Sequence, residues 1–209
     1  MGEKLILIDG HSILNRAFYG VPDLTNAEGI HTNAMYGFLN ILFKFLNRLE
    51  SLLKQNPEYI VVAFDAKGKT FRSELLEEYK GTRKPMQPEL KQQVPLMKEL
   101  LKAMNITVVE QEGYEADDIL GTIAKESAAK GIDVSIVSGD RDLLQLADEH
   151  IKIRIPKTKK GVTEVEDYYP SDVFNLYGVT PHEFIDVKAL MGDTSDNIPG
   201  APGIGPKTA

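Results

Sequence analysis

The chain has 209 residues with 42% hydrophobic content and a net charge of −7, which allows one buried core with a small appendage. No apolar run approaches the roughly 20 residues that cross a bilayer, so we expect no membrane contact. The absence of cysteine excludes disulfides, thiolate zinc sites and cysteine nucleophiles, and favours a cytoplasmic location.

The first predicted elements place an acid and an arginine near the end of a strand. Residues 4–8 are an apolar run typical of a buried strand, which Asp9 closes. Ser12 is a candidate cap for a short following helix that carries Arg16. Arg16 is either a phosphate contact or a solvated surface arginine, and the local sequence leaves both open. A long amphipathic helix is predicted next, over residues 33–55.

A second apolar strand is predicted over residues 59–65, and it also ends in an aspartate. Two such strands separated by a helix predict a βαβ unit with a parallel sheet. Residues 67–91, which follow, hold seven basic against four acidic residues. They form either a mobile surface excursion or a nucleic-acid clamp, in which Tyr79 stacks on a base while Lys80 and Arg83 contact phosphates.

Acids recur after the next two strands. A helix over residues 88–104 and a strand over residues 105–111 precede GYEADDILG, whose three acids crowd the first turn of a helix that runs to about residue 130. These acids either complement the helix dipole or hold a divalent cation. A fourth strand follows, and Asp140 and Asp142 come directly after it, where helix capping is again the alternative.

The rest of the chain is mostly helical after a predicted hairpin over residues 151–166. Short helices are expected over residues 170–177 and 181–191, followed by Asp193 and Asp196. The sequence GAPGIGPK then forms a glycine-rich turn, a geometry that cradles phosphates, but it lacks the Walker A spacing. The chain ends where the second helix of this turn should begin.

Acids after several strands of one sheet predict a metal site, because the carboxyl ends of parallel strands meet in one crevice. Such oxygen ligands suit Mg2+ or Mn2+. An acidic pocket beside a basic segment is what metal-assisted chemistry on a polyanion requires. Without cations we expect raised pKa values or disorder in this site, and we expect metal to stabilise the fold. Nine carboxylates are assigned to this site: Asp9, Asp65, Glu115, Asp117, Asp118, Asp140, Asp142, Asp193 and Asp196.

Six motifs occur in order along the chain: IDGHSILNRAF, VVAFDAKGKTFR, YKGTRKP, GYEADDILGT, VSGDRDLLQL and MGDTSDNIPGAPGIGPKTA. Together they resemble the 5′-nuclease domain of bacterial DNA polymerase I, of the flap-endonuclease family. The resemblance implies an α/β, PIN-like fold with a mostly parallel central sheet flanked by helices. It implies a catalytic domain over residues 1–168, with a helical arch at about residues 67–91. It also implies a helical region over residues 169–209 that ends inside a helix-three-turn-helix motif.

The activity that the resemblance implies is a Mg2+-dependent 5′-3′ exonuclease or flap endonuclease. Such an enzyme hydrolyses DNA or RNA phosphodiesters by two-metal catalysis in primer removal and DNA repair. The implied partners are branched or 5′-flap DNA and RNA primer–DNA hybrids, with a polymerase region in a longer parent chain. We expect the chain to be a monomer.

The resemblance also assigns roles to single positions. Asp9, Asp65, Glu115 and Asp117 correspond to the first metal group, which the other five acids complete, and Lys80 and Arg16 correspond to catalytic residues. A K+ ion is a further candidate at the turn of residues 203–207. The positions that correspond to DNA contacts are Arg72, Tyr79, Arg83, Gly203, Gly205 and Lys207.

Three other functions are alternatives to this nuclease activity. A phosphatase of the haloacid-dehalogenase type needs an acid two residues after Asp9, and His11 stands there. A PIN-type ribonuclease shares the fold and the clustered acids, but explains neither the arch-like segment nor the glycine-rich turn. A non-catalytic or substrate-binding-impaired DNA-binding fragment of the same fold stays open, because the helix-three-turn-helix is incomplete.

Overall fold

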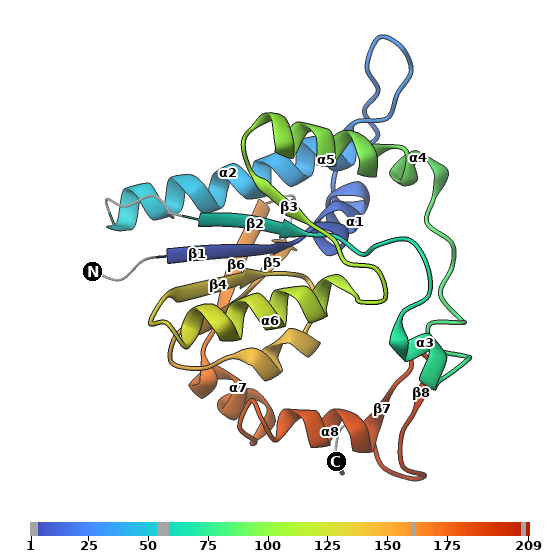
Figure 1. Ribbon diagram of the computed structural model, residues 1–209, viewed down its shortest axis with the longest axis vertical. Coiled ribbons are helices and arrows are strands. Elements are labelled where there is room, and N and C mark those ends of the chain that lie inside the picture. The colour runs from blue at the N-terminus through green and yellow to red at the C-terminus, as the bar shows by residue number, and fades with distance from the viewer. Residues whose placement is uncertain (1–3, 54–58, 160–161, 206–207) are drawn as a thin grey trace.

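The computed structural model describes residues 4–53, 59–159, 162–205 and 208–209 (Figure 1). The six strands of the main sheet, in spatial order, are β3 (Thr107–Val109), β2 (Tyr59–Ala63), β1 (Lys4–Asp9), β4 (Asp133–Val137), β5 (Ile151–Lys159) and β6 (Val162–Tyr168). A separate two-stranded ribbon consists of β7 (Gly192–Asp193) and β8 (Ile198–Pro199). The helices are α1 (Gly10–Gly20), α2 (Asn33–Leu53), α3 (Phe71–Leu75), α4 (Pro88–Lys91), α5 (Gln93–Ala103), α6 (Ala116–Ala128), the 3₁₀ helix η1 (Asp142–Leu146), α7 (Pro170–Tyr177) and α8 (Phe184–Met191).

The sheet is parallel except for its last strand. β1 pairs in parallel with both β2 and β4, β3 and β5 extend the sheet in parallel, and β6 pairs antiparallel with β5. The chain builds one half outward from β1 to β3 and then builds the other half from β4 to β6. The order therefore reverses between β1 and β4, and in such sheets the crevice at the carboxyl ends of these strands is the usual binding site. The predicted mostly parallel α/β sheet is confirmed.

Two hydrophobic layers cover the sheet because its central strands are apolar on both faces. In β1, Leu5 and Leu7 face one layer and Ile6 and Ile8 face the other, and all four are buried. Helices α1, α2 and α5 pack on one face, while α6, η1, α7 and α8 contribute to the core on the other (Figure 1). The helices thus leave the carboxyl edge of the sheet open.

Two local predictions were wrong. The N-cap of α1 is Asp9, whose carboxylate accepts a hydrogen bond of 3.0 Å from the Ser12 amide, so Ser12 is not the cap. The single helix expected over residues 88–104 is divided at Gln92 into α4 and α5. Pro95 explains the break, because it has no N–H to donate to the carbonyl of Lys91.

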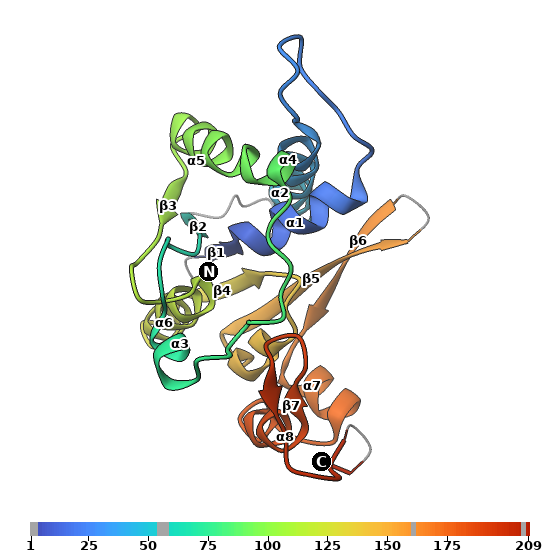
Figure 2. The ribbon, with the colours of Figure 1, turned by 90° about the vertical axis from the view of Figure 1, so that its right-hand side faces the viewer.

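The arch segment, residues 67–91, crosses the open edge of the sheet. It begins near α3 and ends in α4, and residues 76–87 between them form turns and extended chain. Figure 2 shows this stretch passing in front of the carboxyl ends of the strands. The segment is not helical throughout, because helix is present only in α3 and α4, and its assignment as an arch stays a prediction.

A buried glutamine at the start of α5, Gln93, fixes this end of the arch segment to α2. The Gln93 side chain accepts hydrogen bonds from the amides of Ala34 (2.9 Å) and Met35 (3.2 Å) at the start of α2. It donates to the Asn33 side chain (3.0 Å) and to the Glu89 carbonyl (2.9 Å). A fully buried side chain thus caps a helix that lies 58 to 59 residues away in the sequence.

Replacing Gln93 with leucine should lower the free energy of unfolding by roughly 2–4 kcal/mol, because several buried polar groups lose their partners at similar side-chain volume. Urea denaturation at 25 °C measures this change. Gln92→Leu is the matched control and should change stability by less than about 0.5 kcal/mol. Equal stabilities for the two variants would show that Gln93 does not hold α2 in place.

Candidate active site

An open cleft of about 1350 Å³ lies at the carboxyl edge of the sheet. Its walls come from the end of β1 with α1, the end of β2, the arch segment, the start of α6, the end of β4 with η1, Lys188 of α8, and the turn between β7 and β8. All nine predicted carboxylates line it, together with the predicted cations and tyrosine: Arg16, Arg72, Tyr79, Lys80 and Arg83. Residues from seven separate parts of the sequence thus meet where the strand order reverses.

Asp9 is the most buried of these acids, and it lies at the end of the central strand as the N-cap of α1. Its carboxylate accepts hydrogen bonds from the Ser12 amide (3.0 Å) and from the Ser138 hydroxyl (2.8 Å). Burial raises the pKa of Asp9, and these two hydrogen bonds oppose that rise. Ser138 follows β4 and is fully buried, so it fixes the carboxylate from the neighbouring strand.

Asp65 follows β2 and is held from two directions. Its carboxylate accepts a hydrogen bond of 2.8 Å from the Ala116 amide at the start of α6, and lies 3.3 Å from Nδ1 of His11. Although burial acts to raise it, contacts with His11 and the Ala116 amide lower the pKa of Asp65 to about 2. Asp65 therefore stays ionised beside Asp9.

Asp117 differs from every other acid of the cleft. Its Oδ1 is buried and has no hydrogen-bond partner among the described residues. Burial, together with the negative charges of Asp9, Asp140 and Asp65, raises the pKa of Asp117 to about 8. We call Asp9, Asp65, Asp117 and Asp140 the inner carboxylates, and the described residues give none of them an ion pair with a lysine or arginine.

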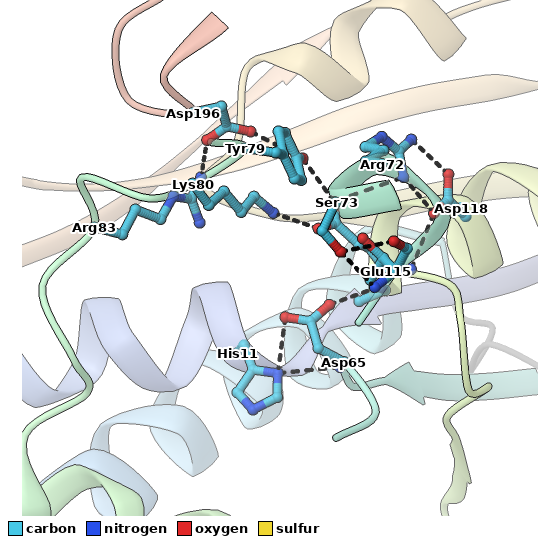
Figure 3. Close-up of polar contacts among 12 residues, drawn as sticks. His11, Asp65, Arg72, Ser73, Tyr79, Lys80, Arg83, Glu115, Asp118 and Asp196 are labelled. Carbon is cyan, nitrogen blue, oxygen red and sulfur yellow. Dashed lines mark hydrogen bonds and ion pairs between the residues drawn. The ribbon is translucent and has the colours of Figure 1, made fainter. Parts of the chain in front are cut away.

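The remaining five acids, which we call the outer carboxylates, are paired with cations. Glu115 accepts from Lys80 Nζ (2.7 Å) and from the Tyr79 hydroxyl (3.0 Å). The same hydroxyl lies 3.1 Å from Asp196, which also pairs with Arg83. Figure 3 shows the side chains of the arch segment pointing toward Glu115 at the start of α6 and Asp196 between β7 and β8. Burial, and then the charge of Glu115, raises the pKa of Tyr79, so its hydroxyl stays protonated.

Two further pairs complete the outer set. Arg72 donates to both oxygens of Asp118, each at 2.7 Å. Lys188 of α8 lies 2.9 Å from Asp142 and 2.6 Å from Asp193, and so bridges two acids. Although burial acts to raise it, contacts with Lys188 and Ser195 lower the pKa of Asp193 to about 2. The predicted rise in pKa is found for Asp9 and Asp117, and also for Asp142, where burial outweighs the contact with Lys188. The pKa values of Asp65, Asp118 and Asp193 are lowered instead, because hydrogen bonds and positive charges outweigh their burial.

The other predicted positions fall in different places. Arg16 lies on α1 within the cleft, where burial lowers the pKa of its guanidinium. The Tyr79 hydroxyl contacts two carboxylates, and stacking of its ring on a base stays a prediction. Gly203 has a φ of +80°, and neither it nor Gly205 lines the described cleft. Lys207 lies outside the described residues.

The inner carboxylates fit a divalent cation. In the part of the chain that the structure describes, no three acids or histidines already stand in a coordinating arrangement. A buried oxygen without a partner, surrounded by three like charges, is nevertheless a position that a cation would stabilise. The donors here are carboxylate oxygens, with neither sulfur nor a cluster of imidazoles among them. Such a donor set suits Mg2+ or Mn2+.

Sequence reasoning missed three residues that shape this cleft: His11, Ser138 and Lys188. Each contacts a predicted acid, but each reaches it from a distant strand end or helix. His11 and Ser138 each lie next to the end of a predicted strand, and that position was the available signal. Lys188 lies within a helix of ordinary composition, and the sequence around it carries no comparable signal.

Comparisons with known proteins agree with this arrangement. The family described as "5'-3' exonuclease, N-terminal resolvase-like domain" matches residues 4–178, and the one described as "5'-3' exonuclease, C-terminal SAM fold" matches residues 179–209. The predicted division at residues 168 and 169 stays a prediction.

Similar sequences are much longer than this chain. DNA polymerase I of Bacillus caldotenax is 52% identical over 209 residues, and that of Bacillus subtilis (strain 168) is 50% identical over 207 residues. These alignments cover 100% and 99% of this chain but 23% of each polymerase. The chain thus spans about a quarter of the length of these relatives.

Solved structures with the same fold are nucleases of bacteriophage T5. A T5 5′-exonuclease with bound zinc ions has a TM-score of 0.73 at 25% identity, covering 99% of this chain and 73% of that one. A T5 flap endonuclease in a complex with DNA and metal ions has a TM-score of 0.71 at 26% identity, covering 98% of this chain and 72% of that one. Within the described residues, no helix combines the length and hydropathy of a bilayer-spanning segment. The chain belongs to the 5′-3′ exonuclease family, to which flap endonucleases also belong.

Proposed function

We propose that this chain hydrolyses phosphodiester bonds of DNA or RNA at 5′ flaps and 5′ ends, with Mg2+ or Mn2+ as its cofactor. The observation that carries this proposal is the unpaired Oδ1 of Asp117 among Asp9, Asp65 and Asp140. The T5 flap endonuclease that binds DNA and metal ions supports it. Roles in primer removal and repair, a cytoplasmic location and a monomeric state stay predictions, as does K+ at the turn of residues 203–207.

The inner carboxylates would hold the cation, and the outer carboxylates Glu115 and Asp118 flank Asp117 in the sequence. A divalent cation supplies a hydroxide from water at neutral pH and stabilises a leaving oxygen. This chain's own groups prepare the site: Ser138 fixes Asp9, and the Ala116 amide fixes Asp65. Two-metal catalysis, in which the outer acids take part, stays a prediction.

Cations of the cleft would bind the scissile phosphate. Lys80 stands 2.7 Å from Glu115 at the mouth of the site, and Arg16 lies on the wall formed by α1. When a phosphate binds here, Lys80 would exchange Glu115 for a phosphate oxygen, so its ammonium would keep a counter-charge throughout. Lys80 and Arg16 would offset the negative charge that builds up on the phosphate in the transition state.

Cleavage of a 5′-labelled flap duplex in Mg2+ tests the proposal, with EDTA as the control. We expect products near the flap junction, and we expect Asp117→Ala and Lys80→Ala each to lower turnover by about 100-fold or more with little change in substrate affinity. Unchanged turnover in both variants would remove these residues from the reaction. Flap binding without cleavage in Mg2+ would instead identify a non-catalytic DNA-binding module.

Asp117→Asn should raise the free energy of unfolding in EDTA at pH 7 by roughly 1–3 kcal/mol, because the raised pKa forces the wild-type carboxyl to take up a proton when the chain folds, and the amide avoids this cost. Millimolar Mg2+ should raise the melting temperature of the wild-type chain but not that of this variant. Asp186→Asn is the control, since it removes an exposed acid on α8. If Asp117→Asn destabilises the metal-free chain, the inner carboxylates are not in mutual repulsion.

A further inference from the structure

Arg72 and Asp118 form the most completely matched ion pair of the cleft. Both guanidinium NH groups donate to the two carboxylate oxygens, each at 2.7 Å, and both side chains are largely buried, at 33% and 20% exposure (Figure 3). The sequence assigned Arg72 to DNA binding and Asp118 to metal binding. In this geometry each group already uses the atoms that such a role would need.

Both partners are anchored to the start of α6. Asp118 is the third residue of that helix, and its Oδ2 also accepts a hydrogen bond of 2.9 Å from the Glu115 amide. On the arch side, the amide of Phe71 donates to the Gly113 carbonyl at 3.1 Å. The Arg72 guanidinium lies over the Phe71 ring, 4.6 Å from its centroid. The pair therefore connects α3 to the turn that presents Glu115 and Asp117.

The contrast with Lys80 separates two kinds of cation in the arch segment. Lys80 meets Glu115 through one contact by a flexible point charge, which a phosphate can replace at low cost. Arg72 spans both oxygens of Asp118 in a planar fork and stacks on an aromatic ring, so a phosphate would have to break two charge-assisted hydrogen bonds. The geometry favours a permanent role for Arg72.

We propose that Arg72 and Asp118 are positioning residues of the nuclease site: Arg72 holds Asp118, which fixes the first turn of α6 so that Glu115 and Asp117 keep their orientation. On this assignment Arg72 supports the site through Asp118 and is not a phosphate contact. The proposal rests on the proposed nuclease function. It makes α3 a part of the support for the inner carboxylates.

The test compares Arg72→Ala, Asp118→Asn and the double variant on the 5′-flap duplex. Asp118→Asn keeps an oxygen for the Glu115 amide and loses only the charged fork. We expect kcat to fall by about 10-fold to 100-fold in each single variant, and by no more in the double variant, because either change releases the same turn. Arg72→Lys should not restore kcat, since an ammonium does not span both oxygens.

Substrate binding in EDTA distinguishes positioning from phosphate contact. We expect the Kd for the flap duplex, and its dependence on salt, to stay at wild-type values in Arg72→Ala. A phosphate-contacting arginine would instead weaken binding and reduce the slope of log Kd against log salt by about 0.9. Lys69→Ala removes an exposed cation of the same segment and controls for the change in net charge.

Two results would overturn the proposal. One is a weaker Kd with a reduced salt slope in Arg72→Ala while Asp118→Asn keeps its full kcat. The other is additivity of the melting-temperature shifts in the double variant, since paired residues are expected to show non-additive shifts. The melting cycle needs no nuclease activity, so failure of the wild-type chain to cleave would reject the proposed function separately from the pairing.

Discussion

Repulsion between carboxylates gathered at one edge of a parallel sheet is the constraint on which this structure depends. β1, β2 and β4 end beside one another, and each delivers an acid there: Asp9, Asp65 and Asp140. α6 adds Asp117 to the same place. The repulsion is offset unevenly, because the outer acids have lysine or arginine partners, while the inner acids contact only hydroxyl, amide or imidazole groups or have no partner among the described residues.

The two sets of acids therefore affect the structure in different ways. The paired outer acids link the arch segment and α8 to the sheet, so they contribute to the fold. The inner acids store unfavourable electrostatic energy at the position where we propose that a cation binds. Proteins often accept lower stability at a functional site when the surrounding structure is strong enough, and here two apolar layers and the Gln93 hydrogen bonds supply that strength.

The sequence predicted the strands, the parallel sheet and the edge at which acids collect, because apolar runs and the ends of parallel strands follow local rules. It did not predict the partners of those acids. Lys188, His11 and Ser138 reach their carboxylates only after the chain has folded, and no periodicity encodes such contacts. The same limit applies to the cap of α1, since Ser and Asp are both good caps and their relative placement decided in favour of Asp9.

The Tyr79 hydroxyl carries one proton but lies within hydrogen-bond distance of two carboxylates, on Glu115 and Asp196. At any instant it can serve only one of them. Glu115 lies in the stretch that matches the N-terminal domain of the family, and Asp196 lies in the stretch that matches its SAM fold. When another group satisfies one of these acids, the Tyr79 hydroxyl keeps its proton and is free to donate to the other acid, so this single side chain links the two stretches.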